Sequence, residues 1–185
     1  MLSTLVFKLI TQPKVLDVSS LTTFGIVTIL VWSFPKEMDH NFLFSYLDVW
    51  IFGGFVVDIS IAWGCFGVRF TEQYTKDTYS EEELSHPSTD WGLRVMTIVY
   101  LVAFAALAGF GVAIGVFTMN GNITWALALR PIQWSTFGVF TSLMQYVIVP
   151  KYMKSKRFQK MLTEKYPDEL AAWEAAHPDH PLAQM

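Results

Sequence analysis

Hydrophobic residues are gathered in four long runs, and polar segments separate them. The runs cover residues 18–34, 42–68, 93–119 and 125–149. About 20 apolar residues suffice for a helix to cross a bilayer, and in lipid only helices or closed barrels satisfy every backbone polar group. Because these runs are long and continuous, they predict an all-α integral membrane protein, a four-helix bundle formed by residues 1–150.

Lysine and arginine are distributed unequally among the segments that connect the runs. The connection between the first and second runs holds only Lys36. The connection between the third and fourth runs holds no cation. The remaining polar segments are much richer in cations, namely Lys8, Lys14, Arg69, Lys76, Arg94, Lys151, Lys154, Lys156, Arg157, Lys160 and Lys165. The positive-inside rule therefore places both termini and the central connection on the cytoplasmic-equivalent face. We expect a bacterial inner membrane or the inner membrane of a mitochondrion or plastid.

Two connecting segments have informative sequences. The third and fourth runs are joined by Asn120, Gly121 and Asn122, which are residue types of tight turns, so these runs should be antiparallel neighbours. The central segment, residues 70–91, is rich in acids, and we interpret it as a solvated acidic loop. Ser80 and Glu83 have the spacing of a capping box, which would start a helical turn within it.

The sequence after Pro150 changes from apolar to charged. Residues 151–165 are basic with interspersed apolar side chains, and Pro167 followed by two acids is typical of a helix start. We expect residues 151–185 to form an amphipathic helical tail. Since free tails usually fray, we further expect a partner subunit to hold it.

Overall composition agrees with a membrane protein and adds little chemistry. Hydrophobic residues make up 52% of the 185 positions, and the formal net charge is −3. Such a small charge does not indicate nucleic-acid binding. The single cysteine, Cys65, cannot form an intramolecular disulfide.

Two oppositely charged residues fall at similar depths within the runs. Asp48 and Arg130 each lie roughly 8–10 Å from the same membrane face at 1.5 Å rise per residue. An ion pair between them would let each charge neutralise the other away from lipid. The alternative is that both side chains extend separately towards the interface.

Asp58 lies deeper and has no cation at its level. A charged residue near the bilayer centre costs roughly 2.5–3.5 kcal/mol, and intramembrane acids therefore mark functional positions. Its expected neighbours are hydroxyl groups, on Thr28 of the first run and on Thr141 or Ser142 of the fourth. Asp58 could tie helices or a neighbouring subunit together, bind a ligand or ion, or transfer protons.

The third run is rich in small residues. Gly111 and Gly115 form a GxxxG motif, which allows close approach of two helix backbones in lipid. The sequence leaves open whether the partner helix belongs to this chain or to another one.

The sequence contains no recognisable catalytic or metal-binding motif. All four histidines, His40, His86, His177 and His180, lie outside the apolar runs, so no imidazole is placed to ligate haem or chlorophyll within the membrane. We predict no cofactor, although a bound structural lipid fits the composition. The function expected is that of an accessory, non-catalytic subunit of a larger membrane complex, such as an energy-transducing one, with other membrane subunits and lipid as partners. The alternatives are a small transporter, channel or proton-coupled protein using Asp58, and a lipid- or sterol-binding protein or enzyme.

Overall fold

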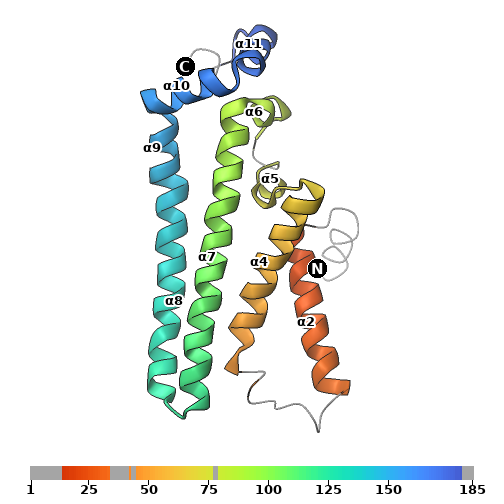
Figure 1. The fold of residues 1–185 in the computed structure, drawn as a ribbon, viewed down its shortest axis with the longest axis vertical. Coiled ribbons are helices and arrows are strands. Elements are labelled where there is room, and N and C mark those ends of the chain that lie inside the picture. The colour runs from red at the N-terminus through yellow and green to blue at the C-terminus, as the bar shows by residue number, and fades with distance from the viewer. Residues whose placement is uncertain (1–13, 34–41, 43–44, 77–78, 181–185) are drawn as a thin grey trace.

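The computed structural model describes residues 14–33, 42, 45–76 and 79–180. All regular elements within these ranges are helices, which confirms the all-α prediction. Four helical columns account for most of the described residues (Figure 1). The first three are α2 (Val15–Ser33), α4 (Leu47–Phe66) and α7 (Pro87–Met119). The fourth is α8 (Ile123–Leu143), which continues through the π-helical segment η1 (Met144–Ile148) into α9 (Val149–Met153).

The columns follow the four apolar runs of the sequence. Helices α4 and α7 are both long and apolar enough to cross a membrane, and they are the two helices that meet this criterion in the described part of the chain. Helix α7 begins six residues before its apolar run, because His86 caps its first turn through Ser88 and Pro87 occupies the first helical position. Residue 34 of the first predicted run and residues 43–44 of the second lie outside the described residues.

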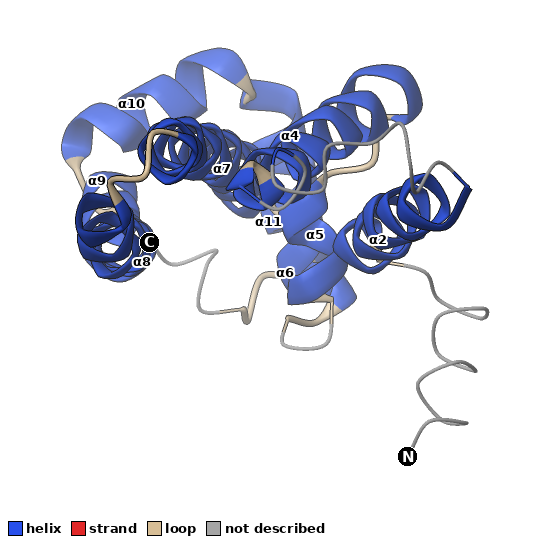
Figure 2. Ribbon diagram, turned by 90° about the horizontal axis from the view of Figure 1, so that it is seen from below, coloured by secondary structure: helices blue, strands red, loops and turns tan. Residues whose placement is uncertain are grey.

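The columns stand in a curved row in the order α8, α7, α4, α2 (Figures 1 and 2). The main contacts join each column to its sequence neighbour, α2 to α4, α4 to α7 and α7 to α8. The turn between α7 and α8 has Gly121 at φ 76°, and Asn122 donates its backbone N–H to Phe117 over 2.8 Å. This tight turn makes α7 and α8 antiparallel, as the residue types of the turn predict.

The hydrophobic core lies where α4, the short helix α5 (Phe70–Thr75) and α7 meet, with Phe137 of α8 at its edge. Its buried members are Phe52, Ile59, Phe70, Phe104 and Leu107. The aromatic rings contact one another in edge and stacked arrangements, for example Phe55 with Phe104 at 5.3 Å between centroids. This geometry is favoured by the ring quadrupoles and adds to the burial of apolar area.

The prediction of a solvated loop over residues 70–91 is wrong. This segment contains α5 (Phe70–Thr75) and α6 (Glu81–Ser85), and the capping box of Ser80 and Glu83 is present at the start of α6. Helix α5 is held because Phe70 is buried in the core and Thr71 Oγ1 donates to Leu93 O at 2.8 Å. Two acids of the segment, Glu72 and Asp90, are also engaged, since Arg69 contacts both of them.

The C-terminal tail forms two short helices, α10 (Lys156–Lys165) and α11 (Pro167–Ala176). Helix α10 runs across the end of the α7 and α9 columns, and α11 lies over α6 (Figure 1). Phe158 and Leu162 of α10 are buried, and the Phe158 ring lies 4.7 Å from the Trp91 ring of α7. The chain therefore holds its own tail, and the expected partner contact is not needed for that purpose. Residues 181–185 of the predicted tail lie outside the described residues.

Candidate functional site

The two glycines of the GxxxG motif mark the closest approach between α7 and α4. A Cβ atom placed on Gly111 would lie 2.9 Å from the Cβ atom of Asp48 and 3.0 Å from the backbone nitrogen of Val49. A Cβ atom on Gly115 would lie 2.5 Å from the Tyr46 ring. Both distances are shorter than real Cβ contacts allow, so only glycine fits at these positions. The partner helix of the motif is thus α4 of the same chain.

Asp48 and Arg130 are brought together at this same level. Asp48 Oδ2 lies 3.5 Å from Arg130 Nη1, and the side chains are 14% and 48% exposed, respectively. The same carboxylate oxygen is buried and makes no hydrogen bond within the described residues. The contact is therefore electrostatic without a hydrogen bond. It neutralises the Asp48 charge while leaving most of the guanidinium donors of Arg130 free for other groups.

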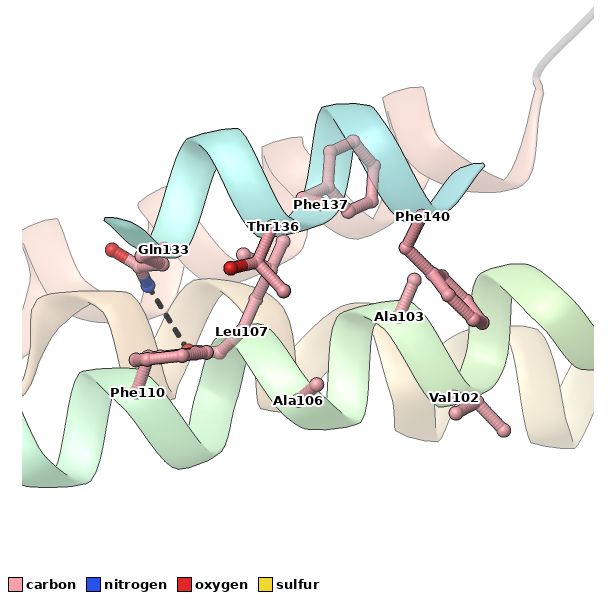
Figure 3. Close-up of a pocket in the computed structure, with 9 residues that line it drawn as sticks. All are labelled: Val102, Ala103, Ala106, Leu107, Phe110, Gln133, Thr136, Phe137 and Phe140. Atoms are coloured by element: carbon pink, nitrogen blue, oxygen red, sulfur yellow. Dashed lines mark hydrogen bonds between the residues drawn. The ribbon is translucent and has the colours of Figure 1, made fainter. Parts of the chain in front are cut away.

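Gln133 is a buried polar residue that the sequence analysis did not single out. It follows Arg130 by nearly one turn of α8, is fully buried, and donates from Nε2 to the backbone oxygen of Leu107 on α7 at 3.0 Å (Figure 3). Its Oε1 atom has no hydrogen-bond partner in the described structure. The amide joins α7 to α8 by one polar bond, as polar side chains do between helices in lipid. The available signal was an amide side chain inside a predicted membrane-spanning run.

A cavity of about 150 Å³ lies beside Gln133, between α7 and α8 (Figure 3). Its wall is almost entirely carbon, and the small side chains of Ala103 and Ala106 create the space opposite three phenylalanine rings. The residues that line it are Val102, Ala103, Ala106, Leu107, Phe110, Gln133, Thr136, Phe137 and Phe140. A cavity with this lining can hold an apolar group, and it offers no charged side chain for chemistry.

Asp58 lies ten residues after Asp48 on α4, away from the Asp48–Arg130 pair, and is half-buried. It follows Gly54 by four residues and so lies on the same side of the helix, where a Cβ on Gly54 would lie 2.8 Å from the Thr23 hydroxyl of α2. No hydrogen bond or ion pair joins Asp58 to any residue that the structure describes. Of its expected neighbours, Thr141 donates instead to Phe137 O of its own helix at 2.7 Å. Within the described part of the chain, Asp58 is thus a carboxylate without a partner, on the side of α4 that carries Gly54.

The outer face of α8 carries a shallow groove that the sequence analysis also missed. Small and apolar residues of α8 and of the following η1 line it, namely Ser135, Gly138, Val139, Ser142, Leu143, Tyr146 and Val147. A Cβ on Gly138 would meet nothing within 4 Å. The hydroxyl groups of Ser135, Ser142 and Tyr146 make no hydrogen bond within the described ranges. We call this feature the α8 outer groove.

A histidine and tryptophan cluster holds α11 against the start of α7. The Trp173 indole N–H donates to Glu82 O and to Ser85 Oγ, each at 3.1 Å, and its ring lies 4.4 Å from the His86 ring. Burial lowers the pKa of His86 below its ordinary value of 6.5, and the nearby charge of His180 lowers it further. No three His, Cys, Asp or Glu side chains converge as a metal site among the residues described.

Comparisons with known proteins provide no relative for this chain: no family model, curated protein or solved structure matches it. Its function must therefore be argued from the contacts described above.

Proposed function

We propose that this protein is an integral membrane protein whose four helical columns all cross the bilayer, and that it is an accessory, non-catalytic subunit of a larger membrane complex. Both ends then lie on the positive-inside face of a bacterial inner membrane or of a mitochondrial or plastid inner membrane. The support for membrane insertion is the apolar character and length of α4 and α7, together with the antiparallel columns beside them.

The observation that carries the subunit role is the α8 outer groove. In lipid, helix association depends on close backbone approach and on polar side chains, because hydrophobicity gives no preference for protein over acyl chains. The groove offers both features, since Gly138 leaves open space and three hydroxyl groups beside it make no hydrogen bond to any described residue. A transmembrane helix of another subunit would fill the space and accept or donate the missing hydrogen bonds.

The open row of columns supports the same role. Helix α4 stands inside the row, yet Phe52 and Ile59 are its only buried residues in the described structure. At the end of the row, α2 exposes large side chains such as Ile29 and Trp32, which are 63% and 82% exposed. Asp58 of α4 has no hydrogen-bond or ion-pair partner among the described residues. A subunit that completes its packing against neighbouring chains would present this kind of surface, and Asp58 would then tie it to one of them.

The test is isolation of the tagged full chain from its native membrane in mild detergent, followed by native mass spectrometry. The proposal predicts recovery of the chain in stoichiometric assemblies with larger membrane proteins. Gly138→Leu should reduce that recovery because the side chain fills the α8 outer groove. Gly109→Leu is the matched control, since a Cβ at Gly109 also meets nothing within 4 Å but lies on α7. Recovery of the wild-type chain only as a monomer in membrane extracts would overturn the subunit role.

A second candidate function is the binding of a lipid or sterol by this chain, and the cavity between α7 and α8 favours it. The cavity has an apolar lining and a buried amide at its end. Ala106→Leu would fill the space and should abolish retention of the ligand by the purified chain. Ala105→Leu is the matched control, because Ala105 is the neighbouring alanine of α7 and does not line the cavity. Equal retention by both variants would exclude the cavity as the binding site.

A further inference from the structure

The corner between α9 and α10 carries a group of cations that the fold does not use. Lys151, Lys154, Lys156 and Arg157 are all exposed, and we call them the corner cations. None of the four forms an ion pair within the described part of the chain. The sequence has no acidic residue between Asp90 and Glu164, so the helices nearest this corner supply no compensating charge.

The two acids that border this stretch are already engaged. Asp90 contacts Arg69 and Arg94, and Glu164 lies 3.7 Å from Lys160 of the same helix. Other acids of this end of the molecule belong to α6 and α11, which lie together on the other side of the end (Figure 1). These acids are Glu81, Glu82, Glu83, Asp168, Glu169 and Glu174, and Asp179 follows directly after α11. The end is therefore divided into a basic side at α9 and α10 and an acidic side at α6 and α11.

The orientation of the corner is fixed by apolar and capping contacts. Phe158 is fully buried against Trp91 and Tyr152, while the Ser155 hydroxyl accepts the Phe158 backbone N–H at 3.2 Å. Gln159 Nε2 adds a bond to Met153 O at 3.1 Å. Because the apolar side of α10 is occupied by the protein itself, its charged side must face outward. The α10 axis crosses the columns at this end of the bundle (Figure 1).

The corner also lies where the apolar surface of the fourth column ends. Val147 and Ile148 are exposed apolar residues, and the first corner cation follows within three positions. Tyr152 beside it is partly exposed, as aromatic residues at a membrane interface are. In a membrane-spanning chain, this step from apolar to basic surface coincides with the headgroup layer. Clusters of four or more cations directly beside a transmembrane helix attract anionic lipids.

We infer that the corner cations form a binding surface for the headgroups of anionic phospholipids in the positive-inside leaflet. The inference rests on the membrane placement proposed above but not on the presence of partner subunits. The phosphate and glycerol oxygens of the headgroups would accept hydrogen bonds from the lysine and arginine side chains, while Tyr152 lies at the boundary with the acyl chains.

The test uses the purified full chain in neutral detergent, mixed with equal amounts of phosphatidylglycerol and phosphatidylcholine and measured by native mass spectrometry. Wild-type chain should retain phosphatidylglycerol in preference to phosphatidylcholine. Each cation removed should weaken retention about fivefold, so Lys154→Gln/Lys156→Gln should lose about 25-fold. The matched control is Lys14→Gln/Lys76→Gln, because Lys14 lies over the Tyr74 ring and Lys76 pairs with Glu72. This control should keep the preference.

Three outcomes separate the possibilities. Equal retention of the two lipids by wild-type chain, or equal loss of preference in both double variants, would overturn the inference. Displacement of phosphatidylglycerol by soluble glycerol phosphate would also overturn it, because the surface would then bind a free phosphate rather than lipid. Helical content measured by circular dichroism identifies a variant that fails to fold, in which case Lys154→Gln alone is used. Absence of the chain from the membrane fraction would refute the membrane placement instead.

Discussion

Helices α7 and α8 are antiparallel neighbours in one hairpin, yet they bury very different numbers of residues. Helix α7 packs against α4 on one side and α8 on the other, and its buried positions include Thr97, Leu107, Gly111 and Gly115. Helix α8 buries Ala126, Gln133 and Thr141, and most of its remaining surface is exposed. The difference indicates two tasks. Side chains of α7 determine the fold of this chain, whereas the outer side chains of α8 are available to another molecule.

The largest effect should come from filling the contact between α7 and α4. Gly115→Leu would drive a side chain into the Tyr46 ring, which a Cβ alone would approach to 2.5 Å. We expect a loss of about 3 kcal/mol or more in the free energy of unfolding, because overpacking at a helix crossing cannot relax. Thermal unfolding of the chain in detergent, followed by circular dichroism, measures it. Gly109→Leu, where the space is open, should unfold close to the wild-type temperature.

The ion pair between α4 and α8 should matter less. Arg130→Met leaves the mostly buried Asp48 carboxylate without its cation, and we expect a loss of about 1–2 kcal/mol, reduced by the exposure of the arginine. Asp48→Asn in the same chain should recover part of that loss. A double-mutant cycle on unfolding in detergent measures the coupling. A double variant as unstable as the sum of the single variants would mean that the two groups do not interact.

The docking of α11 should depend on pH through His86. Its pKa is lowered by burial, so the docked state favours the neutral ring, and the undocked state has the ordinary value of 6.5. Docking is thus fully stable above pH 6.5 and weakens as the pH falls below that value, because the undocked histidine binds the proton more readily. The fluorescence of Trp173 is obtained by subtracting the spectrum of Trp173→Phe. As the pH falls below 6.5, it should shift towards the spectrum of an exposed indole.

A control for this titration is His86→Gln, whose Trp173 signal should show a smaller pH response. If the wild-type and His86→Gln signals changed equally with pH, the response would come from other groups, such as His177 and His180 beside the indole.

The smallest effect on the isolated chain should come from Asp58→Asn. Asp58 has no partner within the described residues. We therefore expect the free energy of unfolding in detergent to change by no more than about 0.5 kcal/mol. Assembly with other subunits should be impaired, because the carboxylate would lose its contact in a neighbouring chain. Impaired folding of the isolated chain with intact assembly would contradict this assignment.

The sequence predicted the helical class and the positions of the columns because apolar runs of this length leave few alternatives. The helical rise per residue also predicted similar depths for Asp48 and Arg130, and the structure places those side chains in contact. The loop prediction over residues 70–91 failed because acids there are engaged by Arg69, a long-range contact that composition does not reveal.

Other features could not be obtained from a linear pattern. Whether Gly111 packs against this chain or another depends on how the columns face one another, and the position of Trp173 depends on the turns before α10 and α11. The α8 outer groove was missed because Ser135, Gly138 and Ser142 become a surface only once the buried side of α8 is known. Gln133 was overlooked for the same reason, since its partner is a backbone carbonyl on a different helix.

The most direct test of the central claim compares tagged wild-type chain, Gly138→Leu and Gly109→Leu after mild solubilisation from the native membrane, by native mass spectrometry. The account predicts larger assemblies for wild type and Gly109→Leu, and loss of the partner with an intact chain for Gly138→Leu. Equal assembly in all three samples would contradict a partner helix in the α8 outer groove, and a monomer in all three would contradict the subunit role itself.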